Sequence, residues 1–288
     1  MVKTINEALY YGKEQLDSVN IESSLSDSLI LLCYVLDLSK TDIIIRKNDV
    51  LSDKDFKAYL SLINKRKARV PVKYLTGVCE FMSLDFYVDK NVLIPRPDTE
   101  ILVEEVIKDF KDKKDVRILD LCSGSGCIGI SLAHYLESSL ITMADISDGA
   151  INTADKNIKK HNLDNKIKII KKDILNETID KKFDIITSNP PYINEEDYKN
   201  LEDDVKLYEP EIALVSRDDE YKFYKRIIDC YYNSLKDDGH MYLEMGYNQS
   251  EYLYEYAKKT GKYKNINIIK DLSGINRVLH LEKWGNLW

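Results

Sequence analysis

Four consecutive residues, Asn189-Pro190-Pro191-Tyr192, follow directly on an apolar run at residues 183–188. This run is rich in β-branched side chains and predicts a short buried strand, which must end at the prolines because proline donates no hydrogen bond to a sheet. The side-chain carbonyl of Asn189 and the backbone carbonyl of Pro190 are two acceptors that could converge on one planar NH2 group, with Tyr192 as a flat lid. Such a clamp would hold a nitrogen in line with an electrophile. The plainer interpretation is a turn that ends a strand, because Asn-Pro and Pro-Pro are common turn dipeptides.

A glycine-rich loop, residues 122–129, follows the strand predicted at 117–121. Gly124, Gly126 and Gly129 match the dinucleotide fingerprint, and Asp145 ends the next predicted strand about twenty residues later. A nicotinamide or flavin dinucleotide fold is therefore one interpretation. Against it, Asp120 would place its negative charge where a pyrophosphate must sit on the helix N-terminus. A ligand with a cationic ammonium and sulfonium, such as S-adenosylmethionine, suits that charge better.

The same positions indicate how such a ligand would be held. Gly124 and Gly126 let the backbone approach its amino-acid part, and Asp145 can accept hydrogen bonds from both ribose hydroxyls. Asp173, at the end of the third predicted strand, would meet the adenine amino group or, alternatively, cap a helix. A hydride-transfer enzyme has no use for an acceptor clamp at a strand end, whereas an N-methyltransferase does. The loop, Asp145 and the Asn-Pro-Pro-Tyr motif together predict an N-methyltransferase.

The composition is that of a soluble, acidic protein. A chain of 288 residues is long enough for one large and one small domain. Its net charge of −7 argues against a general nucleic-acid binder, although an acidic chain can carry a local basic patch. The chain has no apolar run of membrane-spanning length, and its start lacks a signal-peptide core, so we expect a cytoplasmic protein without a membrane partner. Its five cysteines are scattered without metal-ligand spacing, which predicts reduced thiols and no metal site.

Residues 1–70 show the apolar periodicity of helices. Ser26 or Asp27 would cap the second helix. The basic cluster at residues 65–69 predicts a solvated helix end that the macrodipole favours, and a docking surface for nucleic acid is the alternative.

Residues 71–97 change to extended segments. In this region residues 81–88 and 92–94 would pair as a hairpin across 89–91. A linker with two prolines follows, and Asp98 or Thr99 would cap the helix that begins near Glu100. The linker could also form the wall of a cleft.

After residue 100 the chain alternates between strands and helices, which is typical of a doubly wound α/β domain. The predicted strands are at about 117–121, 141–146, 167–171, 183–188, 240–245, 263–269 and 276–282. The predicted helices are at about 100–111, 127–137, 148–161, 219–236 and 249–260.

The motifs taken together resemble those of the HemK/PrmC family, the methyltransferases that modify the glutamine of the Gly-Gly-Gln motif in peptide chain release factors. The likeness covers nearly the whole chain, and the stretch from Ile94 to Glu100 is highly specific to that family. One departure is visible at residues 215–220, where relatives carry a glycine-rich turn. Besides the glycine loop and the clamp, the likeness rests on residues 71–77 with Glu80-Phe81, 92–100, 145–147, 208–210 with Ala213-Leu214, 244–246 with Gln249, and Asp271 with Gly274 and Arg277.

The resemblance implies a fold and a domain organisation. The fold would be α/β, with the seven-stranded, Rossmann-like sheet of a class I methyltransferase whose last strand is antiparallel. Residues 1–70 would form a small helical domain for substrate recognition, 71–97 a β-hairpin linker, and 98–288 the S-adenosylmethionine-dependent methyltransferase domain. The substrate would be a release factor, and we expect a monomer with no direct nucleic-acid substrate.

The resemblance also implies roles for particular residues. The catalytic residues would be Asn189, Pro190 and Tyr192. The cofactor would contact Asp120, Gly124, Ser125, Gly126, Gly129, Asp145, Ile146, Asp173 and Asn189. The substrate would contact Asn189, Pro190, Pro191, Tyr192, Arg96 and Pro97.

Two other functions share parts of this pattern. Enzymes that methylate a ribosomal-protein glutamine, or an exocyclic amino group of a nucleic-acid base, would use the same clamp. Acidic residues at 195–197 and 202–204 make a poor rim for a nucleic-acid groove, because they repel phosphates. A non-catalytic binding module would be expected to have lost Asn189 or a loop glycine, and the chain retains them.

Overall fold

The computed structural model describes residues 4–285, which form two compact units. The smaller unit contains the described residues up to Val78 together with the segment Glu202–Tyr208. The larger unit contains Cys79–Leu201 and the described residues from Glu209 onward. The chain therefore leaves the larger unit after Leu201 and returns to it at Glu209. Among the described residues, no helix is both long and apolar enough to cross a membrane.

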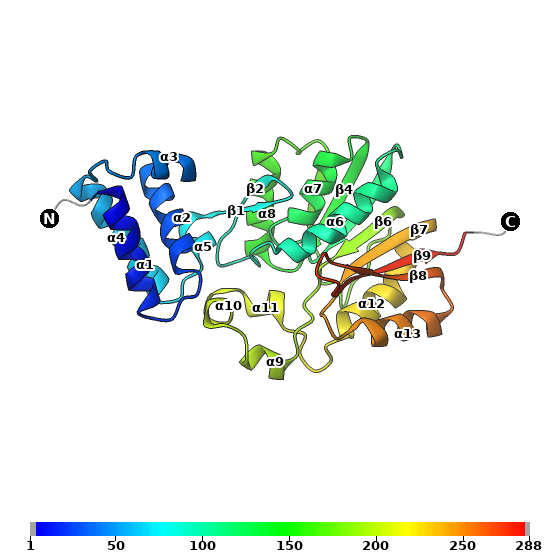
Figure 1. Cartoon of the computed structure of the whole chain (residues 1–288). Coiled ribbons are helices and arrows are strands. Elements are labelled where there is room, and N and C mark those ends of the chain that lie inside the picture. The colour runs from blue at the N-terminus through cyan, green and yellow to red at the C-terminus, as the bar shows by residue number, and fades with distance from the viewer. Residues whose placement is uncertain (1–3, 286–288) are drawn as a thin grey trace. The chain divides into compact units, whose positions relative to one another are not determined.

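The smaller unit is helical (Figure 1). Its core contains apolar residues that recur at helical spacing, among them Ala8, Leu32 and Tyr59, as the sequence predicts. Helix α5 corrects the expectation of extended structure after residue 71, because Gly77 at a φ of 73° ends a short helical turn there. The helices are α1 (Ile5–Asp17), α2 (Ser24–Leu36), α3 (Lys40–Ile45), α4 (Asp53–Lys67), α5 (Val72–Thr76) and α10 (Asp203–Tyr208).

A buried ion pair replaces two features expected at the helix ends of this unit. The expected cap at Ser26 or Asp27 is wrong, since α2 begins at Ser24 and Asp27 lies inside it. The Asp27 carboxylate instead accepts a hydrogen bond from Arg66 Nε at 2.7 Å. Arg66 is only 5% exposed and also pairs with Asp204 of α10 at 2.5 Å. The expectation of a solvated helix end is therefore wrong for Arg66, because two carboxylates draw its guanidinium inside.

The larger unit is built on a seven-stranded sheet, which confirms the α/β fold and the antiparallel last strand. The strand order is β5-β4-β3-β6-β7-β9-β8, and β9 is antiparallel to both of its neighbours while the other pairs are parallel. Each strand predicted in this domain overlaps an observed one. The strands are β3 (Val116–Leu121), β4 (Ser139–Asp145), β5 (Ile167–Lys171), β6 (Phe183–Ser188), β7 (Leu235–Glu244), β8 (Tyr263–Lys270) and β9 (Asn276–Lys283).

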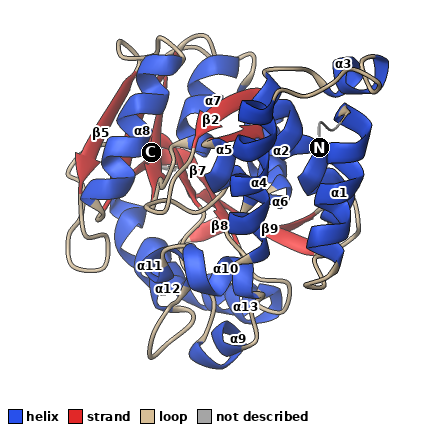
Figure 2. Ribbon diagram, turned by 90° about the vertical axis from the view of Figure 1, so that its left-hand side faces the viewer, coloured by secondary structure: helices blue, strands red, loops and turns tan. Residues whose placement is uncertain are grey.

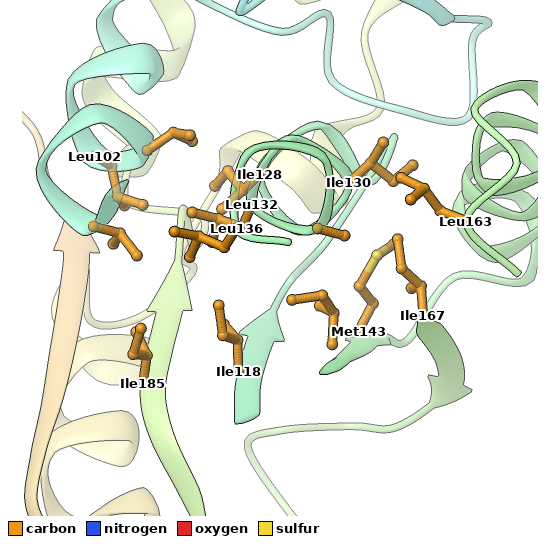
Figure 3. Packing of buried hydrophobic residues seen from close by; sticks show 14 of the residues in the cluster. Leu102, Ile118, Ile128, Ile130, Leu132, Leu136, Met143, Leu163, Ile167 and Ile185 are labelled. Carbon is orange, nitrogen blue, oxygen red and sulfur yellow. The ribbon is translucent and has the colours of Figure 1, made fainter. Parts of the chain in front are cut away.

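Helices flank the sheet on both faces (Figures 1 and 2). One apolar cluster joins alternate residues of the strands to α6, α7 and α8, and Figure 3 shows Ile118 and Ile185 pointing toward Ile128 and Leu132 in it. A second cluster joins the other strand face to α12 and α13. The helices are α6 (Pro97–Phe110), α7 (Cys127–Tyr135), α8 (Asp148–Lys160), α9 (Glu195–Lys199), α11 (Glu211–Leu214), α12 (Lys222–Cys230) and α13 (Ser250–Thr260), with a 3-10 turn at Tyr231–Ser234 that ends the helix predicted to reach 236.

The predicted hairpin exists with a different register. Strands β1 (Val78–Phe81) and β2 (Leu84–Tyr87) pair across Met82 and Ser83, both of which have positive φ, at 49° and 57°. That is the backbone of a two-residue hairpin turn, and the usual Asn-Gly signal is missing from it. Residues 89–91 do form a turn, in which Asn91 N donates to the Asp89 side chain at 2.9 Å. The residues after that turn are not a strand, and Val92 and Leu93 line a cavity instead.

Replacing Arg66 tests the buried ion pair. Arg66→Ala leaves the carboxylates of Asp27 and Asp204 without their buried cation, so we expect the smaller unit to lose about 3–5 kcal/mol of unfolding free energy. Urea unfolding followed by circular dichroism measures the loss. Lys65→Ala is the matched control, because Lys65 is exposed on the same helical turn and should change stability by about 0.5 kcal/mol or less. Equal midpoints for the two variants would contradict the assignment.

Candidate active site

Asn189 follows the end of β6, where the strand is fastened to its neighbour β3. Thr187 Oγ1 donates to Asp120 Oδ1 at 2.9 Å, and Ser188 Oγ donates to the carbonyl of Leu121 at 2.8 Å. Beyond the prolines, Ile193 forms a parallel bridge with Val215. The clamp residues are thus held at both ends. They lie at the carboxyl edge of the sheet beside β3, where the strand order reverses, which is where ligands bind in open α/β sheets.

The side chain of Asn189 is oriented by the residues behind it. Its Nδ2 donates to Thr99 Oγ1 at 3.2 Å. Burial raises the pKa of the nearby Glu244 carboxyl, and Thr99 and Asn189 favour its charged form and lower that pKa in part. The donor end of the amide is therefore occupied. Asn189 lines the cavity described below, so its carbonyl Oδ1 remains as an acceptor for a ligand.

The other three residues of the motif differ in whether they line the cavity. Pro191 lines the cavity, whereas Pro190 and Tyr192 are not among its lining residues. The backbone carbonyl of Tyr192 accepts from Gln249 Nε2 at 3.1 Å, and Gln249 Oε1 accepts from Gly246 N at 3.0 Å. Burial, and the negative charge of Glu244, raise the pKa of Tyr192 well above its usual range, so its hydroxyl stays protonated.

The glycine loop lies between β3 and α7. Gly124 has a φ of 53°, and a Cβ there would meet no atom within 4 Å, so the backbone is open on that side. Gly126 and Gly129 have a different role, because a Cβ on either would come within 3 Å of the side chain of Met143. They permit α7 to pack closely on β4. Ser125 lines the cavity with Gly124, whereas Gly126 and Gly129 do not.

Asp120 lies beneath the loop and not against the ligand space. Its Oδ1 accepts from Thr187, its Oδ2 accepts from Gly129 N at 3.2 Å, and its side chain is fully buried. Asp120 is absent from the cavity lining, which differs from the expectation that its charge faces the ligand. Burial raises the pKa of Asp120 to about 7, against the opposing effect of the two hydrogen bonds.

Asp145 and Asp173 both reach the cavity. Asp145 Oδ2 accepts from Gly124 N at 2.8 Å and its Oδ1 from Ser147 N at 2.9 Å, so the carboxylate ties the loop to the end of β4. Burial raises the pKa of Asp145. Asp173 accepts from Leu175 N at 3.0 Å within a turn, and no helix begins there, so the alternative of a helix cap is wrong.

The cavity encloses about 520 Å³, within the range of roughly 300–1,000 Å³ that is usual for small-molecule sites. All of its lining residues belong to the larger unit. Polar groups of Asp145, Asp173 and Asn189 lie on its wall, together with the apolar side chains of Ile146 and Phe223. In residues 4–285, no group of three or more histidine, cysteine, aspartate or glutamate residues could hold a metal ion.

The stretch from Ile94 to Glu100 fastens the linker to the sheet. Arg96 lines the cavity and pairs with the buried Glu209, which also accepts from Ile94 N at 3.1 Å. Pro97 is the first residue of α6 and lies outside the cavity lining. The expected cap is wrong, because α6 begins without a side-chain cap, and Thr99 lies inside the helix and contacts Asn189. Asp98 pairs with Arg277 at 2.7 Å.

The region that departs from the family pattern forms an ordered connection. Ser216 N donates to the carbonyl of Ile193 at 2.9 Å, and the Ser216 hydroxyl donates to the carbonyl of Asp219 at 2.7 Å. Arg217 lines the cavity and pairs with Glu211. The wall of the cavity is therefore continuous here without a glycine-rich turn.

Sequence reasoning assigned no role to Glu244, Thr99 or Glu209 at this site. Glu244 ends β7, the neighbour of β6, and follows an apolar strand as Asn189 does. A carboxyl at the end of a buried strand, next to the strand that carries the clamp, is the signal that would have found it. Thr99 and Glu209 come from distant segments, and the sequence pattern holds no sign of those contacts.

Comparisons with known proteins agree with this architecture. The family models described as PrmC N-terminal domain and Methyltransferase small domain match residues 7–77 and 97–204. A release factor glutamine methyltransferase of Clostridium botulinum is 40% identical over 282 residues, covering 97% of this chain and 99% of that protein. One of Clostridium acetobutylicum is 39% identical over 277 residues, covering 96% and 97%. A solved methyltransferase from Pyrococcus furiosus shares the fold, with a TM-score of 0.53 and 17% identity over 77% of this chain and 99% of that one.

The sheet order, the glycine loop and the cavity at the carboxyl edge define a Rossmann-like class I methyltransferase, a class that takes its methyl group from S-adenosylmethionine. The near full-length identity to the two clostridial proteins makes the assignment more specific. The chain belongs to the release factor glutamine methyltransferase family.

The raised pKa of Asp120 predicts how stability depends on pH. The pKa of this aspartate rises from 3.8 to about 7 on folding, so the folded state holds the proton more tightly than the unfolded state does. This difference in pKa contributes to the unfolding free energy on the order of a few kcal/mol. The contribution is fully present below about pH 4 and is lost as the pH rises through 7.

Asp120→Asn removes this titration, so only the wild type should lose this part of its unfolding free energy as the pH rises. The variant should therefore gain stability relative to the wild type between pH 5 and pH 8. Urea unfolding at both pH values measures it. Parallel pH dependences for the two proteins would show that Asp120 has no raised pKa.

Proposed function

We propose that this protein transfers a methyl group from S-adenosylmethionine to the side-chain amide nitrogen (N5) of the glutamine in the Gly-Gly-Gln motif of peptide chain release factors. The proposal is carried by one observation: Asn189 lines the cavity with its amide donor already bonded inward, which leaves an acceptor for the N–H groups of a substrate amide. The family membership supports the choice of a release factor as the substrate. We assign recognition of that substrate to the N-terminal helical region.

The residues of the cavity suit S-adenosylmethionine, which supplies an electrophilic methyl group when it is bound. The open side of Gly124 leaves room for the amino-acid part of this molecule to approach the backbone. Asp145 keeps free lone pairs on both oxygens after its two backbone hydrogen bonds, and these can accept from ribose hydroxyls. We assign the adenine to the part of the cavity lined by Ile146 and Asp173. Asp120, Gly126 and Gly129 would act indirectly, by shaping the loop.

The clamp would act by orientation and by electrostatics. An amide nitrogen is a weak nucleophile because its lone pair is delocalised into the carbonyl group. Hydrogen bonds from its two N–H groups to Asn189 Oδ1 and the Pro190 carbonyl would orient it and favour the positive charge that develops on nitrogen during attack. Pro191 and Arg96, which line the cavity, would contact the substrate beside the clamp. The half-buried Tyr192, which packs against an apolar cluster of the sheet, would support the clamp backbone from behind.

An exposed acidic helix argues against a nucleic-acid substrate. Helix α9 follows the clamp and exposes Glu195, Glu196 and Asp197 to solvent. These charges would repel a phosphate backbone close to the site. They present no such barrier to a protein loop that carries a glutamine.

Methyl transfer from labelled S-adenosylmethionine to a purified release factor tests the proposal. We expect the label to appear in the wild-type factor and to be absent from a factor whose Gly-Gly-Gln glutamine is replaced by alanine, since the clamp recognises an amide. Ribosomal protein and DNA serve as parallel acceptors. Label in either of these, with none in the release factor, would overturn the substrate assignment and retain the clamp chemistry.

A further inference from the structure

Glu244 is a buried carboxyl group that the proposed reaction does not yet use. It ends β7, directly beside the end of β6, where Leu243 pairs with Ser188. The residue is 3% exposed, and its Oε2 has no hydrogen-bond partner among the described residues. A buried carboxyl oxygen without a partner costs folding free energy, which suggests that Glu244 is kept at this position for a functional role.

A chain of polar groups connects Glu244 to the clamp. Asn189 Nδ2 donates to Thr99 Oγ1 at 3.2 Å, and that hydroxyl then has its own proton to donate. The side chains of Thr99 and Asn189 both lie close enough to the Glu244 carboxyl to favour its charged form, which lowers its pKa against the larger, raising effect of burial. An ionised carboxylate is an acceptor only, so it fixes the direction of every donor in this chain.

The direction matters because an asparagine amide can present either of its ends. With a carboxylate behind it, the NH2 group of Asn189 turns inward and Oδ1 turns toward the cavity. With a protonated Glu244, the acid can donate instead, and the chain can reverse so that Asn189 presents its NH2 group to the cavity. Two donors would then face each other, and the clamp would not hold a substrate amide.

We propose that Glu244 is a positioning residue that, as a carboxylate, holds the Asn189 amide with its acceptor toward the substrate. This inference rests on the proposed function of the clamp, and it adds a protonation state on which the clamp depends. Burial raises the pKa of Glu244 to about 7, so the group changes its charge within the range in which the enzyme can be assayed.

Other charged or titratable groups surround Glu244 and could be confused with it. Asp98 on α6 raises its pKa further, and Arg277 on β9 lowers it. Arg277 is already engaged by the carboxylates of Asp98 and Asp271. The remaining neighbours that sense its charge are Tyr192, Tyr224 and Cys127, all of which are held neutral by burial. Burial also raises the pKa of Asp120 to about 7, but its carboxyl is bonded to Thr187 and to Gly129 N. Glu244 is therefore the titrating group beside the Asn189 amide.

Glu244→Gln is the first test, because glutamine keeps the shape and removes the charge. We expect kcat at pH 8 to fall at least about tenfold, while the KM for the release factor and the affinity for S-adenosylhomocysteine stay within about twofold. The wild-type kcat should also decline as the pH falls below about 7, and this decline should be absent from the variant. A variant with wild-type kcat, or with the same acid limb as the wild type, would overturn the proposal.

Thr99 provides a matched pair if Glu244→Gln fails to fold. Thr99→Ser keeps the hydroxyl and should retain most of kcat, whereas Thr99→Val keeps the shape and should lose at least about tenfold. Equal activities of the serine and valine variants would contradict the chain of hydrogen bonds.

A measurement without a substrate separates this inference from the proposed function. The side-chain NH2 resonance of Asn189, identified by its loss in Asn189→Asp, should shift with pH near 7 in the wild type and stay constant in Glu244→Gln. A resonance whose chemical shift stays constant with pH in the wild type would overturn the role of Glu244, whatever the enzyme methylates. A pH-dependent resonance in a protein that does not label release factors would overturn only the substrate assignment.

Discussion

The site depends on where β6 stops. Pro190 and Pro191 cannot donate to a neighbouring strand, so the sheet ladder ends at Ser188 and the next residues must leave the sheet. Hydrogen bonds from Thr187 and Ser188 to β3 fix that end point. The position of Asn189 is therefore set by the backbone before any ligand arrives, and the entropic cost of orienting an acceptor is met during folding.

Neighbouring parallel strands then bring one polar group each to the same edge of the sheet. Asp120, Asp145, Asn189 and Glu244 come at the carboxyl ends of β3, β4, β6 and β7 or directly after them. Burial raises the pKa of all three acids. Asp120 and Asp145 hold the glycine loop through its backbone N–H groups, while Glu244 lies behind the clamp. A low-dielectric edge of this kind strengthens each hydrogen bond that a ligand makes there.

The sequence predicted the parts of this arrangement that follow from periodicity and from proline and glycine. All seven strands of the large sheet, the glycine loop and the end of β6 are of this kind. The hairpin register was missed because Met82 and Ser83 adopt a turn conformation that their residue types rarely favour. The sequence predicts a solvated position for Arg66 because its partners, Asp27 and Asp204, lie far from it in the sequence. The sequence predicts a helix cap at Thr99 for the same reason, since its contact with Asn189 joins residues ninety positions apart.

The most direct test of the clamp is the activity of Asn189→Ala beside its affinity for S-adenosylhomocysteine. Methyl transfer to the release factor should fall by about a hundredfold or more, because one of the two acceptors for the substrate amide is gone. The affinity measured by calorimetry should change by no more than about threefold, because Gly124, Asp145 and Asp173 remain. Near-normal transfer by the variant would contradict the account. A loss of affinity as large as the loss of transfer would contradict it equally, since Asn189 would then serve the cofactor and not the substrate.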